Sequence, residues 1–468
     1  MSPEIVEALT ALLGEGRVSG EAADLEAHAR DWSPRALLAR RTGEPSMTPL
    51  AVVRPSGTGE VARLLEWAHE TRTPVVPFGG GSSVVQGIEG RGHVVVDTGD
   101  LDQVSEVDIK SRLVRAGAGV TGPELRAALA EGGYMLGHEP QSHDISTVGG
   151  WVATRAVGQL SSGYGGIERL VAGLEAVLPG GRTITSKTTP RRSTGPDVAA
   201  LMIGSEGTLG IITAVTLRIA PIPDKRADVC VRFDHMSNAI AACRGLAQSR
   251  LAPTVVRAYD AEDTVLLTMG LDEHPTGPLL LMSFDGEDAQ TRAEAAVALA
   301  KGERLGDSIV EYWWSHRNAA VDEYAKTMSG AGLLGPHAMI DTMEVAATWT
   351  SLRSLYHSLK DRLGKHTDFV TCHVSHIYPD GACLYFTLGK SCSDDAEAAA
   401  LNETWWDVGM SACLESGGTI SHHHGIGRLR ARWLPEELGD SFEVLKTLKA
   451  ALDPHGIMNP GALGLNAP

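Results

Sequence analysis

Residues 74–83 read Pro-Val-Val-Pro-Phe-Gly-Gly-Gly-Ser-Ser, an apolar run that ends in three glycines and two serines. The valines predict a short buried strand. Three consecutive glycines let backbone N–H groups turn inward without hindrance from Cβ atoms, and the serine hydroxyls add further donors. A concave row of such donors suits a phosphate or pyrophosphate. The stretch therefore predicts either an anion site or an ordinary glycine-rich surface turn.

The chain around this loop alternates segments of strand and helix character. Residues 58–71, for example, place apolar side chains at helical spacing. Residues 46–222 are predicted to form one α+β domain, and residues 223–440, which repeat the order strand, helix, strand, a second one. Residues 1–45 are expected to form a helical segment and residues 441–468 a tail that closes with a Pro/Gly turn.

Composition and charge exclude several classes of protein. Of the 468 residues, 43% are hydrophobic, which is enough for a full core and excludes a disordered chain. Lys and Arg number 41 and Asp and Glu 58, and the resulting net charge of −17 disfavours non-specific binding to nucleic acid or anionic lipid. No apolar stretch reaches the roughly 18 residues of a membrane span, and no signal peptide is recognisable. Six cysteines without a CxxC pair suit a reducing compartment, so a cytoplasmic location is expected.

A second glycine motif, Gly117-Ala118-Gly119-Val120-Thr121-Gly122, matches GxGxxG between a predicted strand and a predicted helix. This is the context of the Rossmann dinucleotide fingerprint. The parallel βαβαβ repeat that accompanies a nicotinamide site is not recognisable around it. The motif is therefore a weak indication of NAD binding.

Three adjacent imidazoles, His422, His423 and His424, precede a glycine turn. In an extended chain adjacent side chains point to alternate faces, so a metal ion shared by all three is disfavoured and no metal is expected. A solvated histidine run is one interpretation. General acid/base or hydrogen-bonding work near neutral pH is another. Tyr385 lies in a predicted strand, where a tyrosine can equally be an ordinary core residue.

Five blocks of the chain, in this order, resemble alkylglycerone-phosphate synthase (alkyl-dihydroxyacetonephosphate synthase) and the wider vanillyl-alcohol-oxidase/p-cresol-methylhydroxylase (VAO/PCMH) flavoproteins. The blocks are PFGGGSS (77–83), GHEPQSHDISTVGGWVATRA (137–156), RRSTGPD (191–197), GSEGTLGIIT (204–213) and TISHHHGIGRLRARWL (419–434). The resemblance implies a two-domain α+β flavoprotein of PCMH/VAO type. In it, an FAD-binding domain is completed by the C-terminal tail, and a cap domain covers the isoalloxazine ring. A homodimer is a further expectation from the family.

The resemblance also implies which residues contact FAD. The glycine loop would bind the pyrophosphate, and three further segments would complete the FAD site. Some relatives attach FAD through a His in or near the glycine loop; here Ser82 follows the glycines, so non-covalent FAD is expected. The implied cofactor residues are Pro77, Phe78, Gly79, Gly80, Gly81, Ser82 and Ser83, then Gln141, Ser142, His143, Asp144, Ile145, Ser146 and Thr147, then Thr154, Arg155, Ala156 and Val157, and finally Gly204, Ser205, Glu206, Gly207, Thr208, Leu209 and Gly210.

The catalytic set implied by the resemblance is Tyr385, His422, His423, His424 and Arg257. In that family the reaction has no net redox change: an acyloxy group on a glycerone-phosphate substrate is exchanged for an alkoxy group through an adduct with flavin N5. By this resemblance Lys326 occupies the position of a substrate-binding Arg. A lysine keeps the positive charge but lacks the paired donors with which a guanidinium binds both oxygens of an anion. The substrate is expected to be a small molecule, with an anionic group one option. The alternative is an FAD-dependent oxidase or dehydrogenase that transfers hydride from a 2-hydroxy acid, an alcohol or a secondary metabolite to N5.

Overall fold

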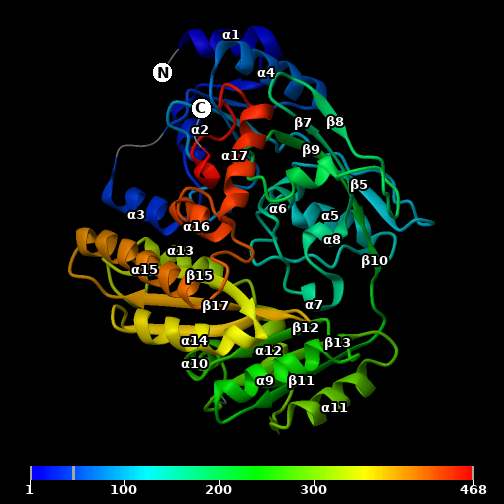
Figure 1. Ribbon diagram of the computed structural model, residues 1–468, viewed down its shortest axis with the longest axis vertical. Helices are drawn as coiled ribbons and strands as arrows, with labels where there is room; N and C mark the ends of the chain where they lie inside the picture. Colours follow the sequence, from blue (N-terminus) through cyan, green and yellow to red (C-terminus); the bar gives the residue numbers. More distant parts are fainter. Residues whose placement is uncertain (1–2, 45–47, 273, 466–468) are drawn as a thin grey trace.

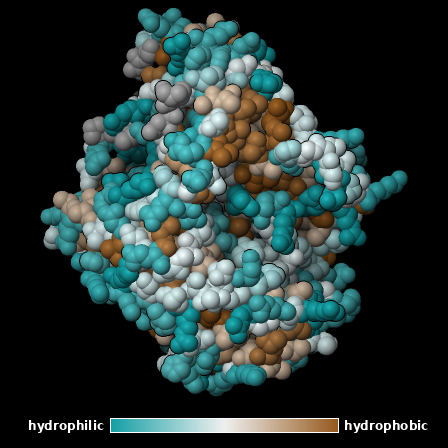
Figure 2. Space-filling model, in the orientation of Figure 1, coloured by the Kyte–Doolittle hydropathy of each residue, from teal (hydrophilic) through white to brown (hydrophobic). Residues whose placement is uncertain are grey.

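The structure is a computed structural model that describes residues 3–44, 48–272 and 274–465. Figure 1 shows two lobes along the long axis of the molecule. The upper lobe holds the N-terminal half of the chain together with its C-terminal end, and the lower lobe holds the middle of the chain. On the face seen in Figure 2 the surface is mostly hydrophilic, and hydrophobic side chains gather in the upper lobe beside helix α17 (Asp440–Leu452). Within the described ranges, no helix is both long enough and apolar enough to span a bilayer.

The upper lobe contains two four-stranded sheets on one hydrophobic core. The first has the order β1-β2-β4-β3, and its strands β2, β4 and β3 are parallel. Three consecutive valines of β4 are fully buried, as expected for a strand covered on both faces. The second sheet, β5-β9-β7-β8, is antiparallel throughout. The strands are β1 (Val18–Ser19), β2 (Ala51–Val53), β3 (Val75–Phe78), β4 (Val94–Asp97), β5 (Leu113–Gly117), β7 (Val171–Val177), β8 (Thr183–Thr185) and β9 (Ile211–Arg218).

Helices and short strands complete the upper lobe. The helices are α4 (Thr58–Thr71), α5 (Gly122–Ala130), α6 (Val148–Thr154), α7 (Ser161–Tyr164) and α8 (Ile167–Leu170), with the 3₁₀ turn η1 (Val198–Met202) and the strand pair β6 (Tyr134–Met135) and β10 (Ala220–Pro221). In α4 the apolar residues recur at helical spacing, so that Val61, Leu64, Leu65 and Ala68 are buried together. Helix α4 thereby packs its apolar face into the upper core.

The lower lobe is built on one seven-stranded antiparallel sheet of order β14-β11-β13-β12-β16-β17-β15. Side chains along β17 alternate: Leu384 and Phe386 enter the core of the lobe, whereas Tyr385 and Thr387 face the other way, into a cavity. The strands are β11 (Arg226–Arg232), β12 (Val255–Tyr259), β13 (Leu279–Asp285), β14 (Glu303–Arg304), β15 (Met339–Thr348), β16 (Phe369–Ile377) and β17 (Gly381–Lys390), and the helices are α9 (Met236–Ala247), α10 (Ala261–Thr268), α11 (Ala289–Ala300), α12 (Ser308–His316), α13 (Ala320–Met328), α14 (Trp349–Leu363) and α15 (Asp395–Glu415).

Both ends of the chain return to the upper lobe. The N-terminal segment forms α1 (Pro3–Leu13), α2 (Ala22–Ala27) and α3 (Pro34–Thr42). Its Leu9 enters the upper core, and its Leu38 enters the lower one. After η2 (Ala431–Trp433), α16 (Leu434–Leu438) and α17, the tail runs beside β3 and ends in η3 (Ala462–Gly464). There the Val75 amide donates to the Ile457 carbonyl at 2.8 Å.

Candidate active site

One cavity of about 1050 Å³ is lined by residues of both lobes. Its upper wall is the glycine loop after β3 with the loop that precedes α6, and its lower wall is the sheet face that carries Tyr385. The predicted cofactor segments and the predicted catalytic residues, far apart in the sequence, therefore meet at one space.

The glycine loop presents a row of amides to this cavity. Within the described residues, no protein group accepts a hydrogen bond from the amides of Gly79, Gly80, Gly81, Ser82 or Ser83. A Cβ on Gly80 would overlap the carbonyl oxygen of Ile145, and a Cβ on Gly79 would overlap the hydroxyl of Thr147. Glycine is thus required here because two loops are pressed together, in addition to the ligand approach expected from the sequence. The five unpartnered amides suit a diphosphate.

Most of the residues predicted to contact the cofactor line the cavity. Glu206 is among them, but its carboxylate is already bonded: it accepts hydrogen bonds from the amides of Ile426 and Gly427, both at 2.7 Å. Burial raises the pKa of this carboxyl. Six predicted residues do not line the cavity, namely His143, Asp144, Arg155, Gly204, Thr208 and Leu209. Of these, Thr208 accepts a hydrogen bond through its carbonyl from buried Lys449, which ties the C-terminal tail to this turn.

The GxGxxG motif has a structural role in the upper lobe. A Cβ on Gly117, Gly119 or Gly122 would overlap a backbone carbonyl oxygen of a neighbouring segment. Of these six residues only Ala118 lines the cavity. The glycines of this motif therefore allow neighbouring segments to pack closely, and the motif does not support NAD binding.

Tyr385 lies at the centre of a group of aromatic and imidazole rings on the lower wall. Its ring centroid is 5.0 Å from that of His373, 5.4 Å from that of His424 and 6.0 Å from that of His423. Burial raises the pKa of Tyr385 to about 12, so at neutral pH the residue is a phenol that can donate a proton or a hydrogen bond.

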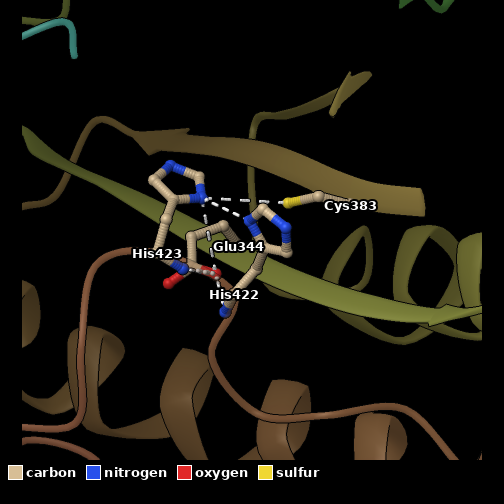
Figure 3. Close-up of side chains that lie close together, drawn as sticks. All are labelled: Glu344, Cys383, His422 and His423. Atoms are coloured by element: carbon tan, nitrogen blue, oxygen red, sulfur yellow. Dashed lines mark hydrogen bonds and ion pairs between the residues drawn. The ribbon is translucent and has the colours of Figure 1, made fainter. Parts of the chain in front are cut away.

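The three-histidine loop is held by Glu344 of β15, whose side chain lies between His422 and His423 in Figure 3. The carboxylate of Glu344 accepts hydrogen bonds from the backbone amides of His422, His423 and His424, the last at 3.0 Å. It also accepts the Ser421 hydroxyl at 3.1 Å and pairs with Arg430 at 2.8 Å. Arg430 and the neighbouring imidazoles hold the pKa of Glu344 well below its usual range, against the opposing effect of burial.

The three imidazoles differ in their surroundings. His423 and His424 line the cavity, whereas His422 does not; it lies 2.8 Å from the Tyr378 hydroxyl and 3.0 Å from Nδ1 of His423. Nδ1 of His424 is buried and has no hydrogen-bond partner among the described residues. Burial lowers the pKa to about 3 for His422 and His423 and to about 4 for His424. At neutral pH they are neutral imidazoles that can accept a proton or a hydrogen bond.

Glu344, Cys383, His422 and His423 have ligand atoms within 4.8 Å of one another, an arrangement that could hold a metal ion (Figure 3). The oxygens of Glu344 are occupied by amides, a hydroxyl and Arg430, and burial raises the pKa of the Cys383 thiol well above its usual value. A metal would have to displace these donors and a thiol proton. This donor set therefore fits a positioned histidine loop better than it fits a metal centre.

Sequence reasoning missed a second series of hydrogen-bonded polar side chains on the same wall. The carboxylate of Asp263 accepts Nδ1–H of His373 at 2.7 Å, and Nε2 of His373 then faces the Arg257 guanidinium at 3.3 Å. These hydrogen bonds thereby hold the side chain of Arg257, which is predicted to be catalytic, in position. Two histidines in the sequence Phe369–Ile377, the strand preceding that of Tyr385, were the available signal.

Several apolar side chains that line the cavity are exposed to solvent. They include Leu266, Met269 and Leu333, of which Met269 is 59% and Leu333 90% exposed. Lys326 lines the cavity as well, in α13. The cavity thus combines cationic groups and neutral imidazoles with apolar side chains that are exposed to solvent.

The residues present fit FAD. Free amides are available for the diphosphate, and the same cavity continues past this loop to the phenol and the imidazoles. The glycine loop and the loop preceding α6 would hold the cofactor.

Comparison with known proteins points the same way. A family model described as "FAD linked oxidases, C-terminal domain" matches residues 222–463, and one described as "FAD binding domain" matches residues 49–187. The uncharacterised FAD-linked oxidoreductase YgcU of Escherichia coli K12 is 32% identical, with 89% of each chain covered. Alkyldihydroxyacetonephosphate synthase of Caenorhabditis elegans is 28% identical over 89% of this chain and 76% of that protein.

Another relative and a solved structure complete the comparison. The mitochondrial D-lactate dehydrogenase [cytochrome] of Arabidopsis thaliana is 28% identical, over 89% of this chain and 73% of that protein. A solved structure of alkyldihydroxyacetonephosphate synthase matches with a TM-score of 0.77 at 25% identity, over 98% of this chain and 85% of that one. The predicted two-domain flavoprotein fold and the predicted FAD cofactor are thereby confirmed.

Proposed function

The chain belongs to the family of FAD-linked oxidases, and we propose that within it the protein is a transferase similar to alkylglycerone-phosphate synthase. It would convert an acyl-glycerone-phosphate-like substrate and a long-chain alcohol into the corresponding ether and a fatty acid. The exchange breaks one carbon–oxygen bond and forms another, without net oxidation.

The observation that carries this proposal is the mixed character of the cavity. Arg257 and Lys326 supply positive charge for an anionic head group, and the exposed apolar residues of the cavity suit acyl and alkyl chains. A small 2-hydroxy acid would use the cationic residues and leave the apolar residues without a role.

The protein groups around the reacting carbon have distinct tasks in this proposal. Tyr385 is a phenol at neutral pH, so it would pass its proton to the neutral imidazole of His423 or His424 as it takes up a proton from the carbon that bears the acyloxy group. The other imidazole would bond the substrate oxygens. Bound FAD in its reduced form would supply a nucleophile. Closing of the cavity by the two lobes would keep water from competing with the alcohol.

The test is an exchange assay. Purified protein with reduced FAD, an acylated dihydroxyacetone phosphate and a radiolabelled long-chain alcohol should release fatty acid and incorporate label into an ether. Tyr385→Phe, which keeps the ring and removes the hydroxyl, is the matched control. Absence of fatty-acid release from the wild-type protein would exclude the transferase.

The alternative, an FAD-dependent oxidase or dehydrogenase, is favoured by the Asp263–His373–Arg257 chain. An arginine held beside a buried neutral imidazole and a phenol also suits a carboxylate next to a carbon that loses hydride. D-lactate dehydrogenase is among the relatives. Loss of the yellow flavin absorbance on anaerobic addition of a 2-hydroxy acid would support this function over the transferase.

A further inference from the structure

A short N-terminal segment, residues 28–33, runs beside the chain that follows the glycine loop. The amide of Trp32 donates to the Ser83 carbonyl at 2.8 Å, and the amide of Gly90 donates to the Ala29 carbonyl at 3.0 Å. Residues 28–33 lie outside both matched ranges, which begin at residues 49 and 222. The family assignment therefore gives this segment no role.

The side chain of Asp31 also joins the two segments. The residue is 1% exposed, and its carboxylate accepts the Gly87 amide at 2.8 Å and the Ser33 amide at 3.1 Å. A carboxylate withdrawn from water requires such donors, because without them its burial costs several kcal/mol. A buried acid placed here thus fixes the position of Gly87 relative to the N-terminal segment.

The same stretch of chain is held from its other side by the C-terminal region. Arg428 donates to the carbonyl of Gln86 at 3.1 Å and to that of Gly87 at 3.3 Å, and the Asn459 side-chain amide also donates to the Gly87 carbonyl at 3.1 Å. Residues 83–90 are therefore clamped between two segments from opposite ends of the sequence. Figure 1 shows these ends together, with α2 next to the C-terminus.

The clamp has a consequence for the amides of the glycine loop. Five consecutive amides without a protein acceptor gain nothing from pointing into the cavity until an anion is bound, so their arrangement depends on the chain at either end. On one side this is β3, and on the other it is residues 83–90.

Trp32 connects the clamp to the substrate side of the cavity. Its side chain is part of the cavity wall, and its carbonyl accepts the Tyr324 hydroxyl of α13 at 3.3 Å. Lys326 lies in the same helix, one half-turn further along. The N-terminal segment thereby contacts both the glycine loop and the helix that carries a candidate substrate-binding lysine.

We propose that residues 28–33 form a third part of the cofactor site, in which Asp31 is a positioning residue for the glycine loop and Trp32 is a wall of the cavity. This inference rests on the assignment of the glycine loop to the FAD diphosphate, and it is independent of which substrate the enzyme uses.

The test measures FAD affinity of the deflavinated protein by fluorescence titration. Asp31→Asn replaces one acceptor oxygen by an NH₂ group that faces a backbone amide, so the dissociation constant of FAD should rise about tenfold, equivalent to about 1.4 kcal/mol. The matched control is Asp395→Asn in α15, which breaks an ion pair with Arg41 and does not line the cavity. It should lower the melting temperature and leave the FAD dissociation constant unchanged.

Trp32→Ala keeps both backbone hydrogen bonds of residue 32 and removes only the wall, so it reports on the site even if Asp31→Asn folds poorly. Its FAD dissociation constant should rise about threefold or more. Wild-type affinity in both Asp31→Asn and Trp32→Ala, or an equal loss in Asp395→Asn, would overturn the inference.

Two variants of Ser82, one charged and one neutral, distinguish a failure of this inference from a wrong assignment of the glycine loop. Ser82→Asp places a carboxylate among the free amides and should abolish FAD binding, whereas the nearly isosteric Ser82→Asn should bind FAD well. If Ser82→Asp binds FAD like the wild type, the glycine loop is not the diphosphate site and the inference falls with it. If Ser82→Asp fails to bind and Asp31→Asn binds normally, the inference alone is wrong.

Discussion

Glu344 and Arg430 form an ion pair of 2.8 Å in which neither side chain has any exposure to solvent. Arg430 also donates to the Ile420 carbonyl at 2.6 Å, and its guanidinium lies 4.9 Å from the ring centre of Trp406. Glu344 also accepts hydrogen bonds from the three backbone amides of the three-histidine loop. Removing one member of such a buried pair costs about 3–5 kcal/mol, whereas replacing both by apolar groups is often neutral.

We predict that Glu344→Gln reduces turnover at least tenfold while FAD remains bound. A carboxamide keeps one acceptor oxygen and turns an NH₂ group toward the amides of residues 422–424, so the imidazoles lose their position beside Tyr385. Turnover, bound flavin and melting temperature should be measured together.

The double variant Glu344→Gln/Arg430→Met distinguishes an effect of Glu344 on the position of the histidine loop from an effect on the stability of the protein. It should recover much of the lost melting temperature, because no uncompensated charge remains buried, but it should not recover turnover. A double variant that regains both would show that Glu344 acts only on stability.

Tyr385→Phe should keep the fold and the flavin and lower turnover by about 10²–10⁴-fold, the usual contribution of a general acid or base. His423→Ala, which removes one ring beside the phenol, should lower it at least tenfold with FAD still bound. The rates follow from steady-state assays on protein with a measured flavin content. Unchanged turnover in Tyr385→Phe would remove this residue from the chemistry.

The glycine loop and the histidine loop stand out in the sequence because each is a run of one residue type. Tyr385 does not stand out in its strand, and only the resemblance to a known family singled it out. Glu344 could not be found in this way, because nothing in its own strand marks one glutamate as the acceptor for a loop some 80 residues further along the chain.

The register of the β16–β17 hairpin shows a second limit. The pairs Ile377–Ala382 and His376–Cys383, extended without interruption, would place Val374 opposite Tyr385. The register shifts between Val374 and His376, so that His373 stands opposite Tyr385 instead. A β-bulge inserts one residue into one strand, and its position depends on tertiary packing that hydrophobic alternation does not encode.

The buried histidines predict a specific loss of stability in acid. The pKa values of His422, His423 and His424 are about 3, 3 and 4 in the folded protein because of burial, and about 6.5 when exposed. Below pH 6.5 only the unfolded chain takes up these protons, so the free energy of unfolding falls with falling pH and is insensitive to these groups above pH 6.5.

Each such histidine contributes a slope of at most about 1.4 kcal/mol per pH unit in this range. Denaturant unfolding of the wild type and of His424→Gln between pH 5 and 6 should therefore differ in slope by about that amount, with the variant flatter. Parallel slopes would mean that His424 is not buried as a neutral imidazole.

Non-covalent attachment of the flavin is a separate prediction. Ser82 and Ser83 follow the glycines, and residues 74–92 contain no histidine, cysteine or tyrosine that could bond covalently to the flavin. The purified protein should be yellow, and acid precipitation should leave all of the flavin in the supernatant. Yellow colour in the washed pellet would show a covalent bond.

Lys326 provides the last prediction, on the head group of the substrate. The side chain lines the cavity from α13, and its positive charge is retained in Lys326→Arg and lost in Lys326→Met. If it binds an anionic group, Lys326→Met should raise KM at least tenfold with a small change in kcat, because an interaction made equally in the ground state and the transition state is removed. Lys326→Arg should bind at least as well as the wild type, since guanidinium adds a second donor to a phosphate or carboxylate. A fall in kcat at unchanged KM in Lys326→Met would instead place the lysine at the reacting carbon, away from the head group.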